Sequence, residues 1–212
     1  MLVGPWDRSV SRATRLLTGL VLYGLALALL VKANLGLDPW NVFNQGVSRR
    51  FGWTLGEITV VTSILLLLAW LPLHQHLGIG TVANALVVGP VLDLGLKLIP
   101  SPHQPAAQAL FLVVAILATA LATGLYVGAG WGPGPRDGIM TGLAARGIPV
   151  LVARAAIELT VLAIGWALGG SVGIATVLFA VSIGPLVSRA LPRLALPAAR
   201  ANPKRERRSS QP

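Results

Sequence analysis

The sequence predicts an all-α fold, a polytopic transmembrane helical bundle of about six spans arranged as two inverted three-helix repeats. Three observations predict it. The composition is 54% hydrophobic and only 11% charged, with a mean hydropathy of +0.74, which is too apolar for a domain whose surface meets water. Six apolar segments have lengths close to those that cross a bilayer. Short motifs recur in the same order at an offset of 95 or 96 residues.

The six apolar segments divide the chain into two halves. Each is near the roughly 20 residues that cross about 30 Å of hydrocarbon, although the first two are shorter. Tryptophans lie near several segment ends, where the headgroup region favours indole rings. The predicted spans are 16–31, 58–73 and 79–99 in a first repeat over 16–99, and 106–131, 150–168 and 172–191 in a second repeat over 106–191.

Basic residues flank these segments and set the expected orientation. The net charge is +10, and seven of the 17 basic residues lie from Arg189 onward. Beside membrane spans such residues are the positive-inside signal, so the lipid bilayer is the expected partner and nucleic acid is not. Treating 1–15 and 192–212 as cytoplasmic basic tails, the second one disordered, places 13 basic residues inside and four outside. We therefore expect both termini in the cytoplasm, with Arg49 and Arg50 in an external loop as an exception.

Start signals mark several helices. Thr54 with Glu57 predicts a capping box before the second span, and the run Ser101–Gln104 predicts another before the fourth. Pro39 and Pro135 each lie shortly after a span and predict two short connector helices, because proline suits the first turn of a helix.

The internal repeat rests on three ordered matches. Each half contains three spans, and because three is odd, the second half must enter the membrane from the opposite side. Inverted repeats are typical of secondary transporters, whose sites lie near the midplane on broken helices. The matches are Gly36-Leu-Asp-Pro-Trp-Asn41 with Gly132-Pro-Gly-Pro-Arg-Asp137, Gly78-Ile-Gly-Thr81 with Gly173-Ile-Ala-Thr176, and Gly89-Pro90 with Gly184-Pro185.

The Gly-Pro pairs are predicted to break the third span of each half. Proline removes one backbone hydrogen bond, so the freed carbonyls near Leu86 and Val181 are available to a partner or a solute. The alternative is that these pairs only help helices to pack, and it is favoured because proline and glycine are common in transmembrane helices.

The chain resembles a known family at several motifs. The loop Gly132-Pro-Gly-Pro-Arg-Asp-Gly138 is similar to that of the YczE-like group within the YczE/YyaS/YitT bacterial membrane proteins. So are Ala33–Asn41, Ile157-Glu158 and Ile183–Leu186, and the resemblance covers roughly 16–192. It implies a multi-pass protein of the bacterial inner (plasma) membrane. It implies no substrate, cofactor or catalytic residue.

The two connectors carry the first candidate site. A helix N-terminus after permissive glycines exposes unpaired N–H groups, and a nearby arginine adds fixed positive charge, so a small anion or polar solute could bind there. The alternative is a tight turn whose Asp137 caps its own helix, and it is favoured. The candidate solute-binding residues in these connectors are Gly132, Gly134, Arg136, Asp137, Pro39 and Asn41.

Charged and polar residues within spans form the second candidate set. A charge at the bilayer centre costs about 2.5 to 3.5 kcal/mol on insertion scales, so a charged residue within a span is a candidate functional residue. Asp93 or Glu158 could relay a proton or cation, and Arg154 could hold a substrate carboxylate. The favoured alternative is neutralisation within i,i+4 pairs, Asp93 with Lys97 and Arg154 with Glu158. Asn84 is a candidate for solute hydrogen bonding or for helix packing.

Several chemistries are not expected. The chain has no cysteine, and His74 and His76 lack further ligands, so we expect no metal and no cofactor. Catalytic dyads and triads are missing from the spans, so we expect no enzyme.

Two functions remain open. One is a transporter-like protein for a small polar or anionic solute, with a homodimer completing the pathway because the chain is only 22.1 kDa. The other is a non-transporting scaffold or assembly factor for a partner protein.

Overall fold

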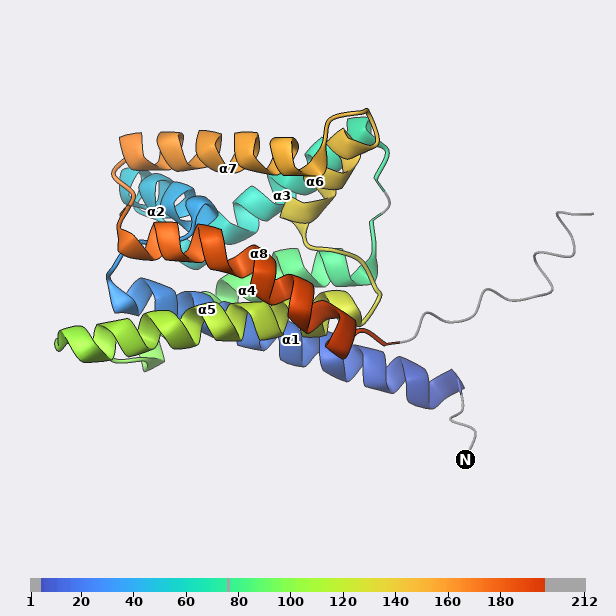
Figure 1. Ribbon diagram of the computed structural model, residues 1–212, viewed down its shortest axis with the longest axis horizontal. Coiled ribbons are helices and arrows are strands. Elements are labelled where there is room, and N and C mark those ends of the chain that lie inside the picture. Colours follow the sequence, from blue (N-terminus) through green and yellow to red (C-terminus); the bar gives the residue numbers. More distant parts are fainter. Residues whose placement is uncertain (1–4, 76, 197–212) are drawn as a thin grey trace, which may run out of the picture.

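The computed structural model describes residues 5–75 and 77–196, and within them the chain forms α-helices and no strand (Figure 1). The helices are α1 (Pro5–Ala33), α2 (Pro39–Phe51), α3 (Leu55–Leu73), α4 (Ile79–Leu98), α5 (Pro105–Gly128), α6 (Pro135–Ala144), α7 (Val150–Ala167) and α8 (Ile174–Leu194).

The six long helices confirm the six predicted spans. Each is long and apolar enough to cross a bilayer, and α2 and α6 are the two shorter helices between them. The first helix extends further than expected, because residues 5–15 of the predicted tail continue α1. In the predicted C-terminal tail, α8 reaches Leu194, and residues 197–212 lie outside the described residues.

The start signals were partly correct. The connector helices begin at Pro39 and Pro135, as predicted. Thr54 and Glu57 form the expected reciprocal capping box of α3. The box at Ser101 was wrong, because α5 begins at Pro105, whose fixed φ suits the first helical position.

The predicted breaks at the Gly-Pro pairs were also wrong. Pro90 lies inside a continuous α4 and Pro185 inside a continuous α8. A transmembrane helix tolerates the one lost hydrogen bond when its neighbours or local adjustments satisfy the freed group.

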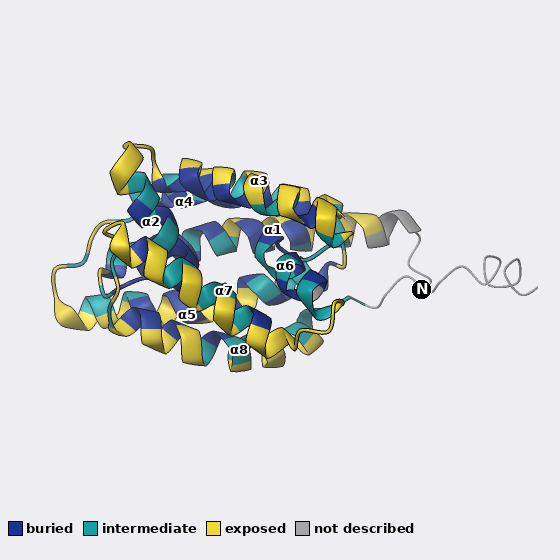
Figure 2. Ribbon diagram, turned by 90° about the horizontal axis from the view of Figure 1, so that it is seen from above, coloured by how far each residue is buried: buried dark blue, intermediate teal, exposed yellow. Residues whose placement is uncertain are grey.

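The core forms around α1 and α5, which pack against each other. Helix α4 covers α1, and α8 covers α5. Two further pairs cross between the halves: α2 packs on α7, and α6 packs on α3. Buried residues face these contacts, and exposed apolar side chains cover the outside, where they contact lipid (Figure 2).

Corresponding helices of the two halves run in opposite directions. Following the colours in Figure 1, α1 and α4 run from right to left and α3 runs back, whereas α5 and α8 run from left to right and α7 runs back. The helix order is otherwise the same, with a long, a short and two long helices in each half.

The connectors dock reciprocally onto the opposite half. The Gly80 amide donates to the Trp131 carbonyl at 2.8 Å, and the Ala175 amide donates to the Leu35 carbonyl at 2.9 Å. The two donors are 95 residues apart in the sequence and the two acceptors are 96 residues apart, which are the offsets of the repeat. Each connector thus holds the first turn of the other half's last helix.

The two halves differ most in one contact. Helix α3 packs closely on α4, whereas α7 and α8 make no comparable contact. In its apolar window α7 is only 11% buried, compared with 33% for α3. A gap between α7 and α8 is therefore the main departure from equivalence between the halves.

Candidate functional site between the two halves

A cavity of about 280 Å³ lies where all eight helices converge. Both connectors contribute to it, and so do equivalent faces of the long helices. Seven of the candidate residues predicted from the sequence line it: Pro39, Asn84, Gly134, Arg136, Asp137, Arg154 and Glu158.

The first charged pair joins the two connectors. Arg136 Nη1 lies 3.4 Å from Asp38 Oδ2, and the guanidinium carbon lies 5.2 Å from the centre of the Trp40 ring. Asp38 is buried and also accepts a 2.5 Å hydrogen bond from Asn41 Nδ2. The guanidinium of one connector is thus held by a carboxylate and an aromatic face of the other.

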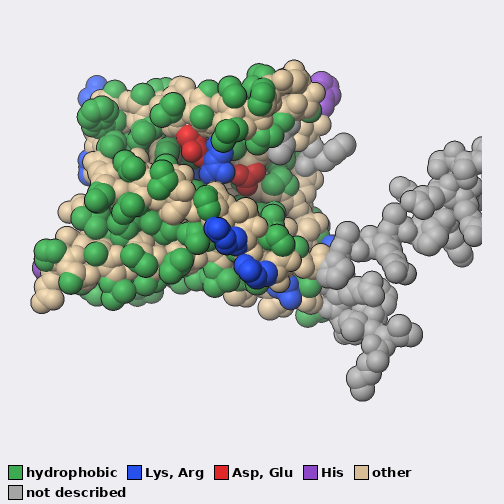
Figure 3. All heavy atoms as spheres, in the orientation of Figure 1, with side chains coloured by type: hydrophobic (Ala, Val, Ile, Leu, Met, Phe, Trp, Pro, Cys, Tyr) green, Lys and Arg blue, Asp and Glu red, His purple; other side chains and the backbone are tan. Residues whose placement is uncertain are grey.

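The second charged pair lies on α7. Arg154 Nε donates to Glu158 Oε1 at 2.9 Å, as the i,i+4 spacing predicted. The side chains are 40% and 21% exposed, so the pair stands at the rim of the cavity. In Figure 3 acidic and basic side chains are visible between the apolar surfaces of α7 and α8. The cavity therefore opens through the gap between these helices.

Asp137 lies deeper, in the first turn of α6. Its carboxylate accepts hydrogen bonds from the Gly134 backbone and from the Tyr126 hydroxyl. It thus caps its own helix, as the favoured alternative predicted. Burial raises the pKa of the Asp137 carboxyl, while Arg154 and Arg136 act against this shift.

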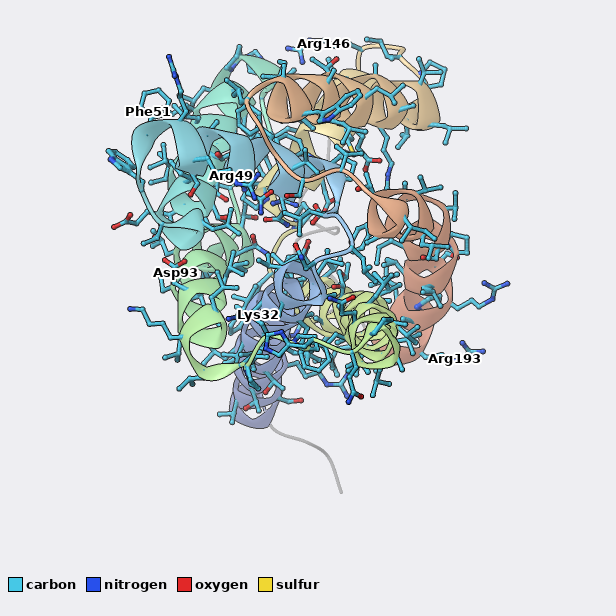
Figure 4. All side chains as sticks on the ribbon, turned by 90° about the vertical axis from the view of Figure 1, so that its left-hand side faces the viewer. Lys32, Arg49, Phe51, Asp93, Arg146 and Arg193 are labelled. Atoms are coloured by element: carbon cyan, nitrogen blue, oxygen red, sulfur yellow. The ribbon has the colours of Figure 1, made fainter. Side chains whose placement is uncertain are left out.

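Three candidate residues lie outside the cavity. Asn41 donates a hydrogen bond to Asp38 and so helps to position its carboxylate. Gly132 has φ +119°, and a Cβ there would collide with Thr81, so its role is to let the connector approach α4. Asp93 lies on α4 (Figure 4), where it lines a second pocket with Gly56 and Glu57.

The expected pairing of Asp93 with Lys97 was wrong. Asp93 Oδ2 accepts from Thr54 Oγ1 at 2.5 Å, and its Oδ1 accepts from the Gly56 amide at 2.8 Å. Its carboxylate therefore holds the first turn of α3, where the unpaired amides and the helix dipole favour an anion.

Sequence reasoning missed several lining residues. Thr59 and Ser63 occupy the positions in α3 that Arg154 and Glu158 occupy in α7, at an offset of 95. Trp40 is the equivalent of Arg136 at an offset of 96. Extending the repeat outward from its three motifs would have found them, since equivalent positions face the same central space. The polar lining residues that were missed, together with Trp40, are Tyr23, Asp38, Thr59, Ser63, Thr119, Thr123, Tyr126 and Ser188.

The cavity is suited to holding a small polar molecule. Its wall carries hydroxyls from α3 and α5, an amide from α4 and the charged pairs of α6 and α7. In the part of the chain that is described, no group of three His, Asp or Glu side chains is placed to hold a metal ion. His76 of the predicted histidine pair lies outside the described residues.

Comparisons with known proteins bear on the chain as a whole. Residues 10–191 match the model of a family of unknown function, DUF6198. An uncharacterised protein of Haemophilus influenzae is 34% identical over 157 residues, 74% of this chain and 72% of that protein. The uncharacterised membrane protein YczE of Bacillus subtilis is 27% identical over 156 residues, 72% of this chain and 73% of that protein. No solved structure matches significantly.

Proposed function

The chain belongs to the family of unknown function DUF6198, and since the family supplies no activity, we propose from the cavity that it is a transporter-like multi-pass membrane protein. It binds a small polar solute between two halves that form an inverted repeat. The observation that carries this proposal is the convergence of both connectors and all eight helices on one polar cavity.

Inverted repeats support this choice because secondary transporters place their sites at the repeat interface. Three features here favour such a repeat: the opposite helix directions, the reciprocal connector hydrogen bonds and the shared helix order. The charged groups in the cavity are the second support, because charges at membrane depth are costly and mark solute or proton pathways.

The charge balance of the cavity limits which class of solute it suits. Both arginines are already paired, Arg136 with Asp38 and Arg154 with Glu158. An anion would have to displace a carboxylate from its arginine, whereas a neutral or zwitterionic solute can exchange hydrogen bonds with both members of a pair. We therefore favour a small polar solute without net negative charge, and binding without chemical conversion.

Ligand-dependent stability of the purified protein tests this proposal. A panel of amino acids, amines, sugars and carboxylates is added to the protein in detergent, and the unfolding temperature is measured. A solute at 100 times its Kd stabilises the folded state by about 2.7 kcal/mol. We expect at least one stabilising solute whose effect is lost in Arg136→Ala and in Glu158→Ala and retained in the exposed control Arg50→Ala.

Uptake of that solute by reconstituted vesicles then separates transport from simple binding. If no member of the panel stabilises the protein or enters vesicles, the proposal fails. Stable co-purification of one partner protein, unaffected by either substitution, would instead support the scaffold function.

A further inference from the structure

The cavity wall holds one more acidic than basic side chain. Five charged residues line it: Asp38, Arg136, Asp137, Arg154 and Glu158. Two ion pairs account for four of them. Asp137 is the carboxylate left over, because no described Lys or Arg nitrogen forms an ion pair with it.

The groups around Asp137 come from its own contacts and from the rest of the cavity lining. Tyr126 on α5 and the Gly134 amide form hydrogen bonds with its carboxylate. Arg136 on its own helix and Arg154 on α7 act at longer range. The other titratable groups that line the cavity are Tyr23 on α1, Asp38 ahead of α2 and Glu158 on α7, while α3, α4 and α8 contribute only uncharged lining residues.

A buried carboxylate without a cationic partner is unfavourable in a medium of low dielectric constant. Its two hydrogen bonds offset part of this cost and leave one negative charge. Taking up one proton removes that charge and makes the lining neutral, without disturbing either ion pair. Asp38 and Glu158 differ from Asp137 in that each lies against a guanidinium, at 3.4 Å and 2.9 Å.

We propose that Asp137 is the proton-binding group of this cavity, so that the lining alternates between one net negative charge and neutrality. Protonation forms an O–H bond on a carboxylate oxygen with a proton taken from water, and deprotonation returns it to water. Its use in coupling a proton to solute movement rests on the proposed function, whereas proton binding itself does not. Asp137 thereby takes the role that the sequence had suggested for Asp93 or Glu158.

Infrared titration of the purified protein in lipid nanodiscs tests the proposal. All carboxyls protonate at low pH, so the diagnostic signal is a carboxylic-acid carbonyl band that remains at a pH where exposed carboxyls are ionised. We expect this band to be lost only as the pH rises further. The band should be absent in Asp137→Asn and retained in Glu158→Gln and Asp93→Asn. A band that persists unchanged in Asp137→Asn, or that disappears in Glu158→Gln, would overturn the assignment.

A second variant keeps the test valid if Asp137→Asn does not fold. Tyr126→Phe retains the carboxyl group and removes a hydroxyl whose hydrogen bond favours the carboxylate. The titration midpoint should therefore move to higher pH. Tyr23→Phe is the matched control, because Tyr23 packs edge-on against Tyr126 at 5.9 Å between ring centres and also lines the cavity. Equal midpoints in Tyr126→Phe and the wild type would contradict the proposal.

The outcomes distinguish failure of this inference from failure of the proposed function. A band that follows Asp137 in a protein that binds and moves no solute preserves the proton site and removes the transporter. A solute that stabilises the wild type, in a protein whose band does not depend on Asp137, preserves the solute site and removes this inference.

Discussion

Asp38 is the residue through which the two connectors are joined. It precedes α2 and lies within hydrogen-bond reach of Asn41 and Arg136, while Arg136 in turn stacks on Trp40. The sequence motif indicated Pro39 and Asn41 as candidates. It did not indicate their neighbours Asp38 and Trp40. A carboxylate before a helix has an ordinary capping explanation, so nothing local identified its distant partner.

Removing Asp38 tests the strength of this junction. Asp38→Ala leaves the Arg136 guanidinium partly buried without its partner, and we expect a loss of about 3 kcal/mol in the free energy of unfolding. The double variant Asp38→Ala/Arg136→Ala should be more stable than the single variant, because it removes the unpaired charge. Unfolding in a detergent titration measures both, and equal stabilities would show that the pair is not coupled.

Asp93 illustrates a charged residue whose role is structural. It accepts hydrogen bonds from Thr54 and Gly56 at the start of α3. We expect Asp93→Ala to destabilise the protein by about 1 to 2 kcal/mol, the usual size of a lost helix cap. Solute-induced stabilisation and the carboxyl titration should stay as in the wild type. A folded Asp93→Ala protein that had lost either property would return Asp93 to the functional site.

At the scale of helices, one glycine contact decides where the bundle is closed. A Cβ on Gly89 of α4 would lie closer than 3.0 Å to the Gly56 carbonyl oxygen of α3, so the two backbones touch there. The equivalent of Gly56 in α7 is Leu151, which is 78% exposed, and a Cβ on Gly184 of α8 would meet nothing within 4 Å. The loss of one glycine therefore accompanies the gap through which the cavity opens.

Alanine at these two equivalent glycines should have opposite effects. Gly89→Ala forces α3 and α4 apart and should cost about 1 to 3 kcal/mol. Gly184→Ala meets open space and should be neutral or stabilise α8 by up to about 1 kcal/mol, because alanine favours the helix. Thermal unfolding of the two variants side by side checks this, and similar losses in both would contradict the difference in packing.

At the scale of the whole molecule, the loops gather at two ends. At one end Lys32 contacts Ser101, and Arg49 contacts Gly169 and Ser171. At the other end Arg15 contacts Leu194, and Arg146 contacts Pro72. Both groups agree with the loop sides expected from the basic residues. Arg136 and Arg154 must be removed from the count of basic residues expected on the cytoplasmic side, because they line the cavity and do not lie in a loop.

Single cysteines decide which end faces the cytoplasm. The chain has no cysteine, so an introduced one has no background. We expect Ser101→Cys to react in intact cells with a maleimide that cannot cross membranes, and Ala145→Cys to react only after the membrane is opened; both positions are exposed. The reversed pattern would place the termini outside, and labelling of both from one side would contradict an even number of spans.

The number of spans, their approximate bounds and the connector starts were readable from the chain, because they depend on neighbouring residues. Hydrocarbon thickness sets span length, and proline acts on its own turn of helix. The structural roles predicted for Glu57, Glu158 and Asp137, as helix-capping or paired residues, were correct for the same reason. Each has a partner within four residues.

The cavity and the division of roles among the acids required the folded arrangement. The partner of Asp38 is 98 residues away, and the partners of Asp93 belong to another helix. Which acid is capped, which is paired and which is left without a cation depends on contacts between distant segments. Hydropathy and spacing report the solvent that each segment needs, whereas the charge balance of a buried site is set only when the two halves pack together.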